Sequence, residues 1–329
     1  MRGFIRRCWR WIVLAAYATV VIATMILHEP WFDEAQAWLI ARDASYHDIL
    51  LVRPHYEGHP PLWWLLLSVP AKLGAPYEIG LKSVQFLCAL LMISLLVFRC
   101  PLPAPVVALL PFTYFLCYQY GVISRPYALM VAAMCLSTIT WKGRDAHPWR
   151  FSLSLALLCS ASSFGIALAC GFALAWIWRA VRDDGIRRLL TKNPQRILSL
   201  SVLLAVGIVL TLLVVPRQNA IALHDTEIPL PQRAALAFLV LPSESLVTSL
   251  TPDTLLTTYS LPWQTIAICA PISLMIMAVL IHLARRRRSL PVFLLPAAML
   301  SVCFVGYAAT HHEGILFAFL LCITSNTCT

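Results

Sequence analysis

The stretch Trp31-Phe32-Asp33-Glu34-Ala35-Gln36-Ala37-Trp38 directly follows an apolar run, residues 11–27, that is long enough to enter a bilayer. A second run of the same character, Glu57-Gly58-His59-Pro60-Pro61-Leu62-Trp63-Trp64, lies in the same polar segment, residues 28–80. Both runs place carboxylates or imidazoles among tryptophans, which favour the boundary between lipid and water. We therefore expect the chemistry of this chain at a membrane surface.

The composition is that of a membrane protein. Of 329 residues, 60% are hydrophobic and 12% are charged, whereas about 25% of the residues of a soluble domain are charged. The mean hydropathy is +0.77. We expect an all-α polytopic membrane protein with spans at about 11–27, 80–98, 104–120, 126–141, 151–163, 165–179, 197–215, 263–284 and 290–308, and a partial apolar segment at 315–323.

The charge distribution predicts the topology. The net charge is +10, but the cations follow the polar links and form no nucleic-acid footprint. Arginines precede the first apolar run, which places the N-terminus in the cytoplasm. In that orientation the inner side carries 18 of the 25 Lys and Arg, and the outer side carries 12 of the 15 Asp and Glu. We predict a multi-pass protein of the plasma (inner) membrane with two long outer loops, residues 28–80 and 217–262.

The two ends of the chain and its cysteines add further expectations. Because no small-residue cleavage site follows the first apolar run, we expect an uncleaved anchor. The 11 cysteines include no Cys-x-x-Cys pair and none lies in either long outer loop, so neither a disulfide framework nor a zinc site is predicted. Only Ile315 to Ile323 are apolar after Gly314, too few to cross a bilayer. Either this segment docks at the interface or the chain is a truncated form.

The first outer loop predicts helices that lie along the membrane. Short amphipathic helices are indicated around Trp38 and Leu50. Pro60-Pro61 then opens a helix over residues 61–74, because proline is well placed in a first turn. That helix would extend only about 21 Å against a bilayer core of about 30 Å. We expect it to be juxtamembrane.

Two motifs in this loop carry ionisable side chains, and each has a structural alternative. Asp33-Glu34 is a pair of carboxylates at the membrane edge, where charge is costly and tends to mark function. Alternatively, Asp33 with Gln36 fits a capping box at a helix N-terminus. Glu57-Gly58-His59 either contributes to a site or is a rigid turn with solvated side chains.

Two further motifs lie later in the chain on the same outer side. Arg125 sits between two apolar runs, so its guanidinium either reaches lipid headgroups or meets a phosphate or carboxylate. His311-His312-Glu313 suggests a metal site with His55 and His59, but no ligand spacing supports one, and solvated interfacial histidines are expected instead. Since all four motifs fall on one face and on different segments, we expect them to converge on one pocket.

At these residues the chain resembles the polytopic glycosyltransferases of the GT-C fold, in particular the family 39 protein O-mannosyltransferases and the lipid A aminoarabinose transferase. The shared features are an Asp-Glu pair after the first span, a Pro-Pro-Leu entry to a juxtamembrane helix, a Gly-to-Lys pattern before the second span, an Arg-Pro-Tyr-Ala-Leu run and a late His-x-Gly segment. They are matched by Asp33-Glu34, His59–Leu62, Gly74 with Lys82, Arg125–Leu129 and His312–Gly314. The resemblance is good over residues 1–145, although aminoarabinose transferases carry Lys where His59 stands.

The resemblance implies a GT-C-like helical bundle that transfers a sugar from a polyprenyl phosphate to an acceptor hydroxyl on the extracytoplasmic side. The carrier phosphate is a good leaving group, so the reaction needs a base near the acceptor and cations on the phosphate, not the paired acids of a glycosidase. The implied catalytic residues are Asp33, the base, and Glu34, which orients it or the sugar. The implied substrate-binding residues are Glu57, His59, Trp63, Lys82, Arg125, Tyr127 and His312, with His59, Lys82 and Arg125 on the phosphate.

The expected partners are the lipid-linked donor, an acceptor lipid, protein or glycan, and membrane lipids; no nucleic acid, cofactor or metal is expected. Two alternatives remain. A transporter or lipid flippase would carry charges on broken helices near the bilayer midplane, whereas here the charges lie in outer loops. A metal-assisted enzyme would use Asp33, His55 and His59.

Overall fold

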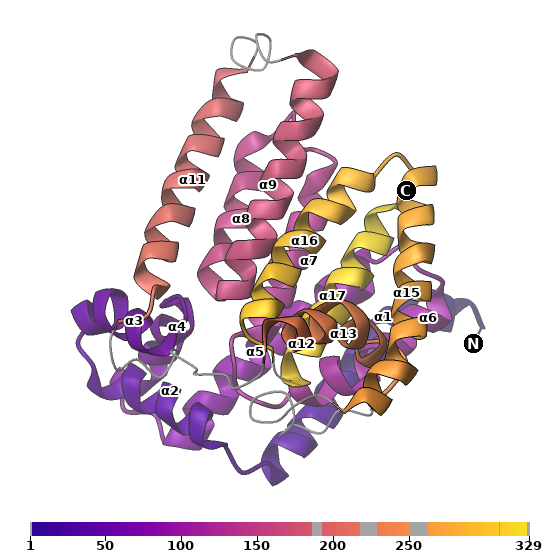
Figure 1. Cartoon of the computed structure of the whole chain (residues 1–329). Helices are drawn as coiled ribbons and strands as arrows, with labels where there is room; N and C mark the ends of the chain where they lie inside the picture. The colour runs from indigo at the N-terminus through magenta and orange to yellow at the C-terminus, as the bar shows by residue number, and fades with distance from the viewer. Residues whose placement is uncertain (1, 186–192, 218–228, 250–261, 309, 328–329) are drawn as a thin grey trace.

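The computed structural model describes residues 2–185, 193–217, 229–249, 262–308 and 310–327. Helices joined by short links account for these residues, and no β-strand occurs among them (Figure 1). The helices that are long and apolar enough to cross a membrane are Cys8–Leu27 within α1 (Arg2–Leu27), α5 (Tyr77–Arg99), Ser163–Asp183 within α9 (Ser163–Asp184), α11 (Pro194–Val214) and α15 (Trp263–Arg286). The expectation of an all-α membrane protein is confirmed, but among the described residues five helices, not the nine predicted spans, are long and apolar enough to cross a membrane.

Helix α7 (Tyr127–Trp141) is the centre of the bundle. It packs against α5, α8 (Pro148–Ala161) and α17 (Thr310–Thr327), and its side chains are buried over nearly its whole length. A helix that is apolar on all sides is suited to such a position. Its N-terminal end therefore holds the preceding segment, which includes Arg125, at a fixed place.

Helices α9 and α16 (Leu290–Gly306) make the most extensive helix–helix contact among the described residues. A Cβ atom at Gly171 of α9 would lie 2.3 Å from the Cα of Pro296 in α16, nearer than real atoms approach. The absence of a side chain at Gly171 therefore lets the two backbones touch. Helix α9 begins, and helix α16 ends, beside the candidate site described below.

Residues 104–120, which the sequence predicts as one span, do not form a continuous helix. They comprise α6 (Ala104–Leu109), a 3₁₀ turn η2 (Leu110–Phe112) and a π-helical turn η3 (Phe115–Gln119). Pro111 lies in the middle of this stretch, and a proline ring both removes a backbone donor and clashes with the preceding turn. The apolar composition is that of a span, but the prolines break the helix.

The apolar stretch 151–179 is broken near the predicted place. Helix α8 ends at Ala161, and the extended residue Ser162 begins α9 by accepting a hydrogen bond from the Phe164 backbone N–H at 3.3 Å. Helix α9 is longer than expected, 22 residues. The segment 315–323 differs more, because it belongs to α17, whose side chains from 315 to 320 are buried inside the bundle.

Residues 28–80, which the sequence predicts as the first outer loop and which keep that name here, fold into short helices across one end of the bundle (Figure 1). These are α2 (Phe32–Asp43), a π-helical turn η1 (Asp48–Val52), α3 (Arg53–Glu57) and α4 (Leu62–Lys72). Helix α4, of 11 residues, corresponds to the predicted juxtamembrane helix and packs against α2.

The second outer loop, 217–262, is described in part. It contains α12 (Leu230–Ala235), a π-helical turn η4 (Leu236–Val240) and α13 (Leu241–Glu244), while residues 218–228 and 250–261 lie outside the described residues.

Candidate functional site

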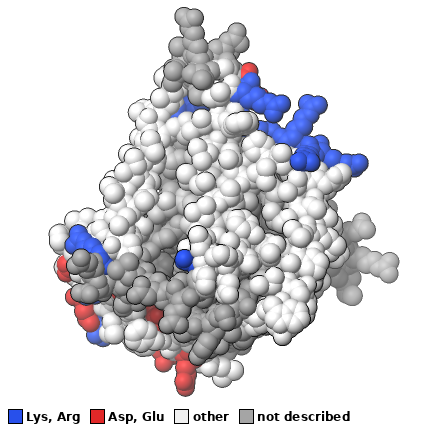
Figure 2. Space-filling view, viewed as in Figure 1, with Lys and Arg blue, Asp and Glu red and all other residues white. Residues whose placement is uncertain are grey.

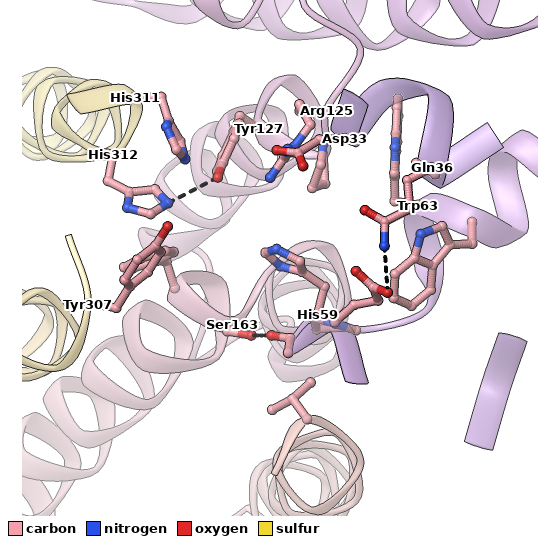
Figure 3. Close-up of a pocket in the computed structure, with 18 of the residues that line it drawn as sticks. Asp33, Gln36, His59, Trp63, Arg125, Tyr127, Ser163, Tyr307, His311 and His312 are labelled. Carbon is pink, nitrogen blue, oxygen red and sulfur yellow. Dashed lines mark hydrogen bonds and ion pairs between the residues drawn. The ribbon is translucent and has the colours of Figure 1, made fainter. Parts of the chain in front are cut away.

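A cavity of about 460 Å³ lies where the first outer loop meets the bundle. Its walls come from α2, the α3–α4 link with the start of α4, the start of α7 with the residues before it, the start of α9, the end of α11, and the end of α16 with the start of α17. Ten of the lining residues are labelled in Figure 3: Asp33, Gln36, His59, Trp63, Arg125, Tyr127, Ser163, Tyr307, His311 and His312. The predicted convergence of the motifs on one pocket is therefore seen in the structure.

Asp33 and Arg125 form a direct salt bridge in the cavity. The Arg125 guanidinium donates to Asp33 Oδ2 across 92 residues of sequence. Asp33 lies in the first turn of α2, and its side chain is 51% exposed, whereas that of Arg125 is 18% exposed. Of the two predicted alternatives for Arg125, the structure shows the one in which it meets a carboxylate.

Glu34 faces away from the cavity and is fully buried. Its Oε2 accepts a hydrogen bond from the Trp31 backbone N–H at 2.8 Å and lies 2.9 Å from His28 Nε2. Its Oε1 accepts from the Ser124 backbone N–H at 2.6 Å. Glu34 therefore ties together the end of α1, the start of α2 and the residue before Arg125, which positions the salt-bridged pair.

The predicted capping box on Asp33 is corrected by this geometry. The N-cap residue is Trp31, so it is Glu34, three positions later, that reaches back to the N-cap N–H. Gln36 does not cap the helix, and its Nε2 instead donates to Glu57 Oε1 at 2.9 Å. Asp33 is thus left to face the cavity (Figure 3).

His59 enters the cavity from a rigid turn. Gly58 takes the left-handed conformation, φ 66°, that ends α3, and its carbonyl accepts a hydrogen bond from the Ser163 hydroxyl. Burial, with the nearby Arg125 cation, lowers the pKa of His59 to about 4. The imidazole is therefore neutral at pH 7. It can offer one N–H donor or one lone pair to a ligand, but not a positive charge.

Two buried polar atoms of the cavity wall have no hydrogen-bond partner among the described residues. They are His59 Nδ1 and Trp63 Nε1. Buried polar groups are normally paired, so each such atom calls for an explanation. A polar ligand in the cavity would satisfy both.

Glu57 supplies a second carboxylate to the cavity. Burial raises the pKa of Glu57, and Gln36 is its hydrogen-bond donor. The Trp63 and Trp64 rings lie nearby in the same wall, so this end of the cavity combines aromatic faces with a hydrogen-bonded acid.

The opposite wall is made by α7 and α17. Tyr127 Oη and His312 Nε2 form a hydrogen bond of 3.1 Å, and the two side chains are 1% and 2% exposed. The His312 ring also packs against Phe164 with centroids 4.5 Å apart. The expectation of solvated histidines is therefore wrong for His312, because α17 carries it into the bundle.

Lys82 lies outside the cavity. It sits on α5, where its ammonium group pairs with Glu78 one turn earlier, and neither residue lines the pocket. The remaining predicted binding residues, Glu57, His59, Trp63, Arg125, Tyr127 and His312, all line it. Sequence reasoning missed Tyr307 and Ser163, which lie beside a motif and a helix break, whereas His311 belongs to a motif that was expected at the pocket.

The alternative with a metal on Asp33, His55 and His59 finds no geometric support. His55 does not line the cavity, and its Nδ1 lies 2.9 Å from the Val215 carbonyl oxygen. Among the described residues no group of three or more His, Cys, Asp or Glu side chains is arranged to hold a metal ion.

Comparison with protein-family models, with curated proteins and with solved structures gives no match for this chain. The functional argument therefore rests on the residues and the geometry of the cavity.

Proposed function

We propose that this chain is a membrane glycosyltransferase that moves a sugar from a polyprenyl phosphate to an acceptor hydroxyl in the cavity, on the extracytoplasmic side. The observation that supports this most is the cavity itself. At the end of a helical bundle it pairs a carboxylate, Asp33, with a guanidinium, Arg125, among aromatic walls. A guanidinium matches the geometry of a phosphate, and a carboxylate is a suitable general base.

The reaction follows from the way in which Asp33 and Arg125 are joined. A carboxylate that is paired with a guanidinium is a weak base. Binding of the donor phosphate to Arg125 therefore first breaks the salt bridge between Arg125 and Asp33. Asp33 then accepts the proton of the acceptor hydroxyl, and the acceptor oxygen forms a bond to the anomeric carbon. The bond from that carbon to the phosphate oxygen breaks, and polyprenyl phosphate leaves with the electron pair.

The other cavity residues have supporting roles in this scheme. Arg125 stabilises the departing phosphate, and neutral His59 donates a hydrogen bond to it. Trp63 and Trp64 offer aromatic faces to the sugar, and Glu57 with the Trp63 N–H offers hydrogen bonds to its hydroxyls. No general acid is needed, because phosphate is already a good leaving group.

The test is the substitution Asp33→Asn in the purified full chain in lipid nanodiscs. The donors are polyprenyl-phosphate mannose and polyprenyl-phosphate aminoarabinose, with the sugar labelled, and membrane lipid and peptide fractions serve as acceptors. Loss of a general base predicts a fall in transfer of about 10²- to 10⁴-fold. The matched control is Asp43→Asn at the exposed end of the same helix, which should keep full activity.

Polyprenyl phosphate binding is measured alongside, and it should survive Asp33→Asn. Transfer that persists in Asp33→Asn would remove Asp33 from the role of base. A flippase or transporter would bind the carrier but give no labelled glycoconjugate with any variant, so the same assay separates the two classes.

A further inference from the structure

A cluster of arginines lies at the end of the bundle opposite the cavity. It consists of Arg144 in the α7–α8 link, Arg179 near the end of α9 and Arg196 in the first turn of α11, and we call it the arginine cluster. The cavity lies at the other ends of these same helices. Figure 2 shows Lys and Arg side chains gathered near this end of the molecule. The proposed function does not use the cluster.

One carboxylate serves two of these guanidinium groups. Asp145 Oδ2 lies 3.3 Å from Arg144, and Asp145 Oδ1 lies 3.2 Å from Arg196. The same carboxylate also accepts the Trp176 indole N–H at 3.0 Å. The side chains of Arg144 and Arg196 are 11% and 10% exposed, so among the described residues this largely buried place holds more guanidinium groups than carboxylates.

The third guanidinium adds to this excess. Arg179 donates to the backbone carbonyl of Arg288 at 2.8 Å. Among the described residues, the exposed Asp183 is a second acid whose charge reaches Arg144. Burial, together with the charges of Arg179 and Arg196, lowers the pKa of Arg144. A bound anion would offset both the excess of positive charge and the lowering of the Arg144 pKa.

Two independent features favour an anion at this place. Helices α8 and α11, of 14 and 21 residues, begin here at Pro148 and Pro194, and helix N-termini attract negative charge. In addition, Arg144 Nε is buried and has no hydrogen-bond partner among the described residues, in a residue that is 9% exposed. Its unused N–H is a donor that an anion would satisfy.

We propose that the arginine cluster binds a phosphate group, as carried by the headgroup of an anionic phospholipid. Arginine is suited to phosphate oxygens because its planar group donates two parallel hydrogen bonds. The Trp141 ring lies 4.2 Å from the Arg144 guanidinium carbon, so an indole packs beside the cluster. Basic pockets between helices are known to hold acidic headgroups.

The test measures thermal unfolding of the purified full chain in detergent micelles that contain phosphatidylglycerol, phosphatidylcholine or neither. A second series replaces the lipid with inorganic phosphate. We expect phosphatidylglycerol to raise the unfolding temperature more than phosphatidylcholine does. A rise with inorganic phosphate alone would also support the site and would assign it to free phosphate, whereas no rise with either probe overturns the proposal.

Variants locate the effect. Arg179→Gln alters a partly exposed side chain whose one described hydrogen bond goes to a backbone carbonyl, so the protein should fold. Loss of one charge-assisted contact should weaken phosphatidylglycerol binding about tenfold. The matched control is Arg99→Gln, exposed in the last turn of α5, which should keep the wild-type response.

Three outcomes contradict the proposal. These are a response that Arg179→Gln leaves unchanged, a response that Arg99→Gln reduces equally, and an equal response to both lipids. The first shows that the cluster is not the site, and the other two show that the protein responds to surface charge or to lipid in general. Native mass spectrometry of the wild type gives a second readout, because one phosphatidylglycerol per chain should survive release from the micelle.

Discussion

At the scale of single residues, two adjacent carboxylates have opposite environments. Asp33 is half exposed in the cavity, whereas Glu34 is fully buried and joins three segments. Successive residues on a helix point about 100° apart. Two adjacent acids at a helix start can therefore face different surroundings, here the cavity for Asp33 and the protein interior for Glu34. The sequence identifies the pair as important but does not say which member faces the cavity, because that depends on where the Ser124 backbone lies.

The two carboxylates should respond differently to substitution. Glu34→Ala leaves the N–H groups of Trp31 and Ser124 without their acceptor, so we expect a loss of about 2–4 kcal/mol in the free energy of unfolding. Asp33→Asn breaks a partly exposed ion pair and should cost less than about 1 kcal/mol. Thermal unfolding in detergent measures both. Equal losses for the two variants would contradict this division of roles.

His59 predicts a specific dependence of stability on pH. Its pKa is about 4 in the folded protein, against an ordinary value of 6.5. As the pH falls below 6.5, His59 becomes protonated in the unfolded chain but stays neutral in the folded chain until about pH 4. The free energy of unfolding therefore decreases between pH 6.5 and pH 4. The loss is on the order of 3 kcal/mol.

The measurement compares unfolding of the wild type and His59→Gln between pH 7.5 and pH 4. The wild type should lose stability relative to the variant across this window, because the variant lacks the titrating group. His47→Gln, at an exposed position of the same outer loop, is the matched control. Curves for wild type and His59→Gln that stay parallel would show that His59 titrates normally.

The prediction that Lys82 binds the donor phosphate rested on the resemblance alone. A glutamate four residues before a lysine is a common surface pair on a helix, and Glu78 and Lys82 form that pair. The resemblance nevertheless assigned Lys82 to the phosphate. Arg125, His59 and Trp63 were predictable because ionisable or aromatic groups stand there at the edge of apolar runs without an obvious local partner.

At the scale of elements, helix breaks decide where the cavity forms. The interruption at Ser162 was visible in the sequence as a run of small polar residues, and it places Phe164 in the cavity wall. The breakdown of 104–120 was less predictable, since its hydropathy resembles that of a span. Pro111 was the signal, and its effect is strong enough to outweigh composition.

The close contact of α9 with α16 gives an element-scale prediction. Gly171→Ala should lower the free energy of unfolding by about 1–3 kcal/mol, because the new methyl group meets the Pro296 backbone, which cannot move aside easily. Gly207→Ala in α11 is the matched control, since nothing lies within 4 Å of the added carbon. It should raise stability by up to about 1 kcal/mol. A stable Gly171→Ala protein would mean that the helices can separate at no cost.

At the scale of the whole molecule, composition was sufficient to predict a helical membrane protein, and charge was sufficient to predict an orientation. The sequence could not show that α17 lies inside the bundle. Its apolar run is short, and only the packing partners on α7 and η3 distinguish a buried helix from an interfacial one. His312 was therefore expected in the right region but in the wrong environment.

The orientation is tested by cysteine labelling in intact cells, in a background without native cysteines. We expect Tyr46→Cys, exposed in the first outer loop, to react with a membrane-impermeant maleimide added outside. Arg286→Cys, at the exposed end of α15, should react only after permeabilisation. The reverse pattern would invert the topology and place the cavity in the cytoplasm.

The salt bridge between Asp33 and Arg125 has a kinetic consequence for a transferase. Under the proposed function, Asp33 stays paired with Arg125 until the donor phosphate draws that guanidinium away, so an acceptor that arrives first meets no free base. Productive turnover then requires the donor to arrive before the acceptor, and initial-rate kinetics should show that compulsory order.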